Sequence, residues 1–182
     1  MFPLSDILTI EKMTSDRLSC GTSNLFGIIV YTDEHPYIKK MLRDTDYWES
    51  LNARTKGWLI YAVRPGDNSL GVTEDYLLPL LDIQDSGNLP QLILITPTPD
   101  NHFLQRNYPI DDTNVETAYK SLQSTVDKVT AAVAKINAQD RDGVDIHKVV
   151  TDALDHELAK QRWKRVSFPF LGLIREIVGL VI

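Results

Sequence analysis

Three short, almost uninterrupted apolar runs constrain the fold of this chain more than any other feature. They cover residues 25–31, 58–63 and 91–96, and each is rich in β-branched or aromatic side chains. Continuous rather than alternating hydrophobicity is typical of strands that are covered on both faces. The sequence therefore predicts three buried strands at these positions.

Helical patterns separate the three expected strands. Pro36 suits the first turn of a helix, and the apolar residues that follow it fall on one face. Asp46 and Glu49 have the spacing of a capping box for a second short helix, and Thr73 is a candidate N-cap of a helix that Pro79 must kink or restart. Because alternating strands and helices imply right-handed crossovers, we predict a three-layer α/β domain with a mainly parallel sheet of three to five strands. Flavodoxin-like and thioredoxin-like arrangements both fit.

The C-terminal third has a helical pattern instead. A helix capped by Asp112 or Thr113 is expected to run to about Ala138, with apolar residues that recur at alternating spacings of four and three. These residues, called the seam below, are Val115, Tyr119, Leu122, Val126, Val129, Val133 and Ile136. A second helix is expected over 145–165. The predicted organisation is an α/β core over 1–110 and a helical C-terminal arm over 111–182, packed on the core or on a partner.

The chain ends in a segment that is costly to leave in water. Residues 168–182, called the C-terminal segment below, carry only Arg175 and Glu176 as charges. Each large apolar side chain gains about 1.5–3 kcal/mol on burial. Three burial sites fit: the chain's own fold, a partner protein or second copy, and a membrane interface, although an interfacial helix needs a polar face that this segment almost lacks. The residues expected at an interface are Leu171, Ile174, Ile177, Val178 and Val181.

Composition excludes several classes of function. The net charge of −6 argues against general binding to nucleic-acid phosphates. The single cysteine, Cys20, can form neither an internal disulfide nor a thioredoxin-type dithiol nor a cysteine-rich zinc site. No basic segment followed by an apolar run opens the chain, and no stretch of eighteen apolar residues exists, so a cytoplasmic location is expected.

Polar residues follow each expected strand. Asp33 and Glu34 come after the first strand, Arg64 after the second, and Asp100 and His102 after the third. Open parallel sheets bind ligands at the carboxyl ends of their strands, so these side chains would converge if the strands were adjacent and parallel. The four acidic and imidazole groups could then bind a divalent metal, while Arg64 held an anionic group. Ordinary solvated loops are the simpler interpretation.

Three functions remain open at the level of sequence. The chain has no glycine-rich phosphate loop, nucleophile elbow or zinc-type histidine–glutamate motif. We therefore expect, first, a non-enzymatic interaction subunit without a cofactor, which docks through the seam and the C-terminal segment onto another protein or a second copy. The second hypothesis is a metal-dependent hydrolase or phosphotransfer-type enzyme that uses the strand-end residues. The third is peripheral membrane attachment through the basic run 160–165 and the C-terminal segment.

Overall fold

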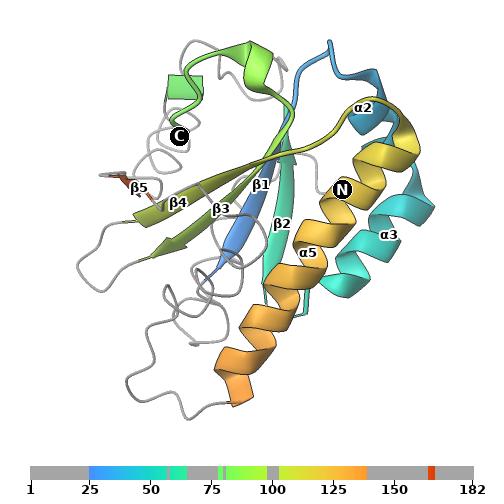
Figure 1. Cartoon of the computed structure of the whole chain (residues 1–182). Coiled ribbons are helices and arrows are strands. Elements are labelled where there is room, and N and C mark those ends of the chain that lie inside the picture. The colour runs from blue at the N-terminus through green and yellow to red at the C-terminus, as the bar shows by residue number, and fades with distance from the viewer. Residues whose placement is uncertain are drawn as a thin grey trace, which may run out of the picture.

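The structure is a computed structural model that describes residues 25–56, 58–64, 78–79, 81–97, 103–138 and 164–166. The described strands form one five-stranded mixed sheet in the order β2-β1-β3-β4-β5, so the chain has α/β character (Figure 1). In chain order the elements are β1 (Phe26–Val30), α2 (Pro36–Arg43), α3 (Thr45–Arg54), β2 (Leu59–Val63), the short 3₁₀ helix η2 (Ser86–Asn88), β3 (Gln91–Pro97), β4 (Phe103–Pro109), α5 (Val115–Ala138) and β5 (Lys164–Val166).

The strand directions differ from the sequence-based expectation. The three expected strands are confirmed as β1, β2 and β3. β1 and β2 are parallel, but β3 is antiparallel to β1, β4 to β3 and β5 to β4, so the prediction of a mainly parallel sheet is wrong for the described strands. Val30 pairs with both Val63 and Gln91, which means that the chain leaves β2 and enters β3 at the same end of the sheet. A run of buried apolar residues carries no information about strand direction.

β4 is a strand that the sequence analysis did not predict. Its central residues Gln105 and Arg106 are polar, yet only 4% and 2% exposed. The Gln105 side-chain amide donates hydrogen bonds to the carbonyl oxygen of Leu81 and to the side-chain oxygen of Asn107. The Arg106 guanidinium lies 5.4 Å from the centre of the Tyr108 ring. Polar groups with such specific contacts can be buried, but they mask the apolar pattern of a strand.

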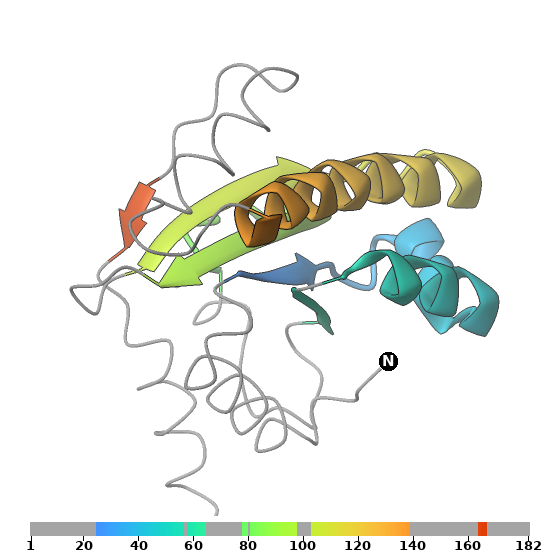
Figure 2. The ribbon, with the colours of Figure 1, turned by 90° about the horizontal axis from the view of Figure 1, so that it is seen from below.

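The helices α2, α3 and α5 cover one face of the sheet. The three helices contact one another, and Figures 1 and 2 show them on the same side of the strands. One hydrophobic core joins them to β1, β2, β3 and β4. Its least exposed members include Ile29, Ile38, Leu51, Trp58, Leu92 and Leu94. Gly27 lies in this contact, because a Cβ there would come within 3.0 Å of the Leu92 and Trp58 side chains.

The seam of α5 faces this core. Leu122, Val126 and Val129 are at most 1% exposed, Val133 is 8% exposed, and Val115 and Tyr119 pack partly buried against the same cluster. The side chain of Ile136 lies outside the described residues. α5 therefore packs on the sheet of its own chain, and the described seam side chains are already in contact there.

The ends of three predicted helices need correction. Asn114 rather than Asp112 or Thr113 caps α5, because its side-chain oxygen accepts the Thr117 N–H at 2.9 Å. Asp44 rather than Asp46 caps α3, and its carboxylate accepts two backbone N–H groups of the first turn. The helix expected over 145–165 lies outside the described residues except at its end, where residues 164 and 165 belong to strand β5 instead.

Two further findings concern the part of the chain that the structure describes. None of its helices is both long and apolar enough to cross a membrane. The Leu89–Pro90 peptide bond before β3 is cis, and the Pro90 carbonyl oxygen accepts the Ile110 N–H at 2.9 Å. The C-terminal segment and Cys20 lie outside the described residues.

Candidate functional site

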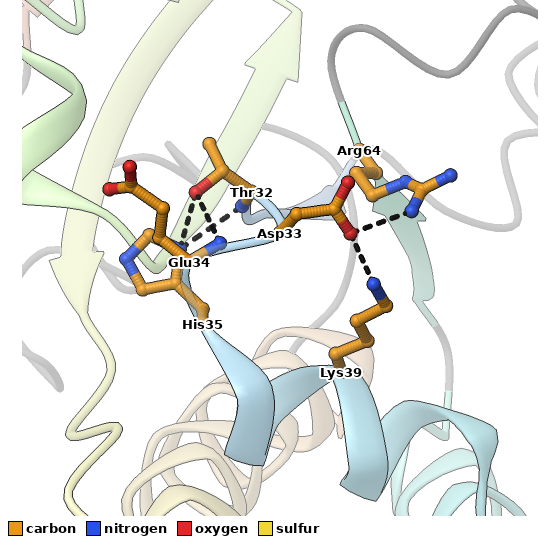
Figure 3. A network of polar contacts seen from close by, with 6 residues as sticks. All are labelled: Thr32, Asp33, Glu34, His35, Lys39 and Arg64. Carbon is orange, nitrogen blue, oxygen red and sulfur yellow. Dashed lines mark hydrogen bonds and ion pairs between the residues drawn. The ribbon is translucent and has the colours of Figure 1, made fainter.

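The carboxyl ends of β1 and β2 bring together the polar side chains that the sequence analysis singled out on these two strands. The loop between β1 and α2 carries Thr32, Asp33, Glu34 and His35, and Arg64 follows β2 directly. Because β1 and β2 are parallel neighbours, both chain exits lie at the same edge. Figure 3 shows these residues together with Lys39 of α2, and we call the six residues the strand-end cluster.

Asp33 is the centre of the charged half of this cluster. Its Oδ1 accepts a hydrogen bond from the Arg64 guanidinium at 2.8 Å and another from the Lys39 ammonium (Figure 3). The hydrogen bond from Lys39, followed by that from Arg64, holds the pKa of Asp33 below its ordinary value. The carboxylate is 67% exposed, whereas Lys39 and Arg64 are 25% and 26% exposed. Asp33 therefore stays ionised and has one oxygen engaged by two cations of its own chain.

His35 and Thr32 form the other half. The Thr32 N–H donates to Nδ1 of His35 at 3.1 Å, and the Thr32 hydroxyl lies 2.9 Å from the same nitrogen. A ring nitrogen that accepts a backbone N–H carries no proton, so in this arrangement the proton of the neutral ring is on Nε2 and the Thr32 hydroxyl donates to Nδ1. The lone pair that a general base would use is thus directed to the loop backbone. His35 closes the loop before α2.

The first turn of α2 is capped from a distant part of the chain. His35 occupies the N-cap position but makes no side-chain cap hydrogen bond. Instead Oδ1 of Asp112, which lies between β4 and α5, accepts the Ile38 N–H at 2.6 Å. Burial raises the pKa of Asp112 above its ordinary value, although the hydrogen bond from the Ile38 backbone opposes that rise. A carboxylate is favourable at a helix N-terminus, so Asp112 satisfies this end of α2 and ties it to the α5 connection.

The structure describes two of the four residues that were expected to bind a metal together, Asp33 and Glu34. Asp33 and Glu34 lie beyond Val30, which pairs with Gln91 at the amino end of β3. β3 ends six residues further on at Pro97, which is about 20 Å away at a rise of roughly 3.3 Å per residue. Asp100 and His102 lie outside the described residues, so their place in the expected metal site stays a prediction.

The premise for a shared metal site was that all strands end at one edge, and the antiparallel β3 removes that premise. Among residues 25–56, 58–64, 78–79, 81–97, 103–138 and 164–166, no group of three histidine, cysteine, aspartate or glutamate side chains is arranged to hold a metal ion. Arg64, which was expected to hold an anionic group, is bound to Asp33.

The residues expected at a protein interface fall into two groups, one described by the structure and one outside the described residues. The described seam side chains, from Val115 to Val133, contact the core and are not on the surface as a docking stripe. Leu171, Ile174, Ile177, Val178 and Val181 lie outside the described residues. On the described surface, Tyr37 at 40% exposure is the single large hydrophobic side chain that is exposed.

Two contacts in this region could not be predicted from the sequence. Lys39 lies six residues after Asp33, and Asp112 lies 74 residues after Ile38, and both spacings fit countless unrelated pairs. The strong local signal was Pro36, which correctly placed the start of α2 and hence the neighbourhood of Lys39. No local signal in the sequence relates Asp112 to α2.

Comparison with known proteins adds no family assignment. No family model, no curated protein and no solved structure matched this chain.

Proposed function

We propose that this chain is a non-enzymatic interaction subunit that binds another protein or a second copy of itself through the C-terminal segment. The sequence contains two apolar surfaces, the seam and the C-terminal segment, and both suggested a docking role. The observation that supports the narrower proposal is the burial of the seam: Leu122, Val126 and Val129 contact the chain's own core and are at most 1% exposed. The C-terminal segment is the apolar surface that then remains for a partner.

The finer assignment of the fold belongs to the same proposal. A flavodoxin-like sheet has the strand order 2-1-3-4-5 with parallel strands. The described order agrees with that, but β3 and β4 run in directions that a flavodoxin-like sheet excludes. We infer a thioredoxin-like arrangement, in which a parallel strand pair is combined with an antiparallel hairpin.

A thioredoxin-like fold without its chemistry supports a binding role. Thiol–disulfide exchange needs a thiolate and a second sulfur, and the chain has one cysteine. The loop that precedes α2 carries Thr32, Asp33, Glu34 and His35, whose side chains or backbone groups contact one another or neighbouring cations. These contacts give the loop a structural role. No contact among the described residues favours the metal-dependent enzyme or the membrane-attached protein. We further propose that the interaction subunit is cytoplasmic.

The proposal is tested by adding charge to the C-terminal segment of the full chain. Ile174→Asp combined with Val178→Asp puts two carboxylates four residues apart, on one face if the segment is helical. Light scattering over a range of concentrations reports self-association, and affinity capture from the native host compares the proteins retained by each variant. We expect the double variant to stay folded by circular dichroism and to lose the second copy or the captured partner.

The matched control adds the same charge elsewhere. Ser124 and Ala131 are exposed positions of α5, so Ser124→Asp combined with Ala131→Asp should retain both the mass and the captured proteins. Identical mass and identical capture for the wild type and the Ile174/Val178 variant would contradict the proposal. An unfolded Ile174/Val178 variant would contradict it as well, because it would assign the segment to the chain's own core.

A further inference from the structure

We draw no further inference here: the strongest candidate, the N-terminus of α2 with His35 and the exposed Tyr37, carries nothing because Asp112 already caps it and no second observation among the described residues points to a ligand there.

Discussion

Asp33 accepts hydrogen bonds from Lys39 and Arg64 through one carboxylate oxygen, and its pKa is lowered from the ordinary value of 3.8. Because the pKa of Asp33 is lower in the folded state, its contacts with Lys39 and Arg64 stabilise the fold at pH values above the unfolded-state pKa. That contribution is lost as the pH falls through the folded-state pKa. Because Asp33 is largely exposed, the effect on stability is small, and the titration itself is the sensitive readout.

Removal of the Lys39 charge tests this arrangement. Lys39→Met should raise the pKa of Asp33 towards its ordinary value, because the largest cause of the lowering is the Lys39 hydrogen bond. Carboxyl-carbon NMR over an acid titration measures it. Lys40 is exposed on the same helix, so Lys40→Met is the matched control and should change the pKa of Asp33 much less. Equal shifts in the two variants would show that Lys39 has no specific contact.

Asp112 tests whether the distant cap of α2 acts as the geometry indicates. Asp112→Ala removes the acceptor of the Ile38 N–H and should lower the free energy of unfolding by about 1 kcal/mol. Asp112→Asn keeps an acceptor oxygen and removes the partly buried charge, so it should retain most of the stability at pH 7. Urea unfolding of the three proteins makes the comparison, and an alanine variant as stable as the wild type would contradict the cap.

The raised pKa of Asp112 also determines how its contribution to stability changes with pH. The pKa of Asp112 is raised on folding, so the folded state binds more protons and the contribution of Asp112 to stability falls as the pH rises above 3.8. The stability of Asp112→Asn minus that of the wild type should therefore increase between pH 3 and pH 7. A difference that decreases over this range would mean that the hydrogen bond outweighs burial.

At the scale of residues the sequence predicted the start of α2, but not the side-chain contacts that hold it. Pro36 places the start of α2 because its ring fits the first helical turn, and the structure agrees. The cap of α3 was misplaced by two residues because Asp44 and Asp46 are chemically equivalent candidates. Asp112 could not be related to Ile38, because a hydrogen bond across 74 residues depends on the tertiary fold rather than on spacing.

At the scale of elements, α3, β2 and α5 meet at Trp58. Its indole N–H donates to the Thr130 hydroxyl at 2.8 Å, and that hydroxyl donates to the carbonyl oxygen of Arg54 at 2.8 Å. Trp58 is 1% exposed, so water cannot replace the lost partner. One hydroxyl thus joins the end of α3, the start of β2 and the middle of α5.

Substitution of Thr130 measures that junction. Thr130→Val keeps the shape but leaves the Trp58 N–H buried without its acceptor, which should cost about 1–3 kcal/mol of unfolding free energy. Thr130→Ser keeps the hydroxyl and should stay much closer to the wild type. Urea unfolding followed by tryptophan fluorescence separates the two variants. Equal stability of Thr130→Val and the wild type would contradict the junction.

Elements with a clean apolar pattern were predictable, and β4 was not. The runs that form β1, β2 and β3 are nearly free of polar residues, so burial dictated the interpretation. In β4, Gln105 and Arg106 are buried with specific polar contacts, so no continuous apolar run marks the strand. Burial of polar groups depends on partners such as the Leu81 carbonyl oxygen, which the sequence does not reveal.

For the whole molecule, the unpredicted quantity was strand direction. The connection from β2 to β3 covers residues 64–90, which is long enough to return to either end of the sheet. In the structure the connection brings the chain back to the end of the sheet at which β2 ends, so β3 runs antiparallel to β1. The carboxyl end of β3 therefore lies far from Asp33. The candidate metal site therefore depended on a topology that apolar runs cannot specify.

For the seam, too, the sequence pattern shows burial but not the surface that covers it. A regular spacing of four and three residues predicts that one face of α5 is buried, but it does not say against what. The structure gives the answer for Val115 to Val133: they pack on the sheet and on α2 and α3. We propose that the C-terminal segment, rather than the seam, meets a partner.

Thermal unfolding of two full-chain variants, at concentrations where each is monomeric, tests this division most directly. Leu122 is 1% exposed in the core, so Leu122→Ala should cost about 2–5 kcal/mol, and at roughly 2–4 °C per kcal/mol it should lower Tm by about 4–20 °C. The Ile174→Asp/Val178→Asp variant should melt within about 2 °C of the wild type, because less than about 0.5 kcal/mol would be lost from the monomer. The reverse result, a large loss of Tm for the C-terminal variant and none for Leu122→Ala, would contradict the account.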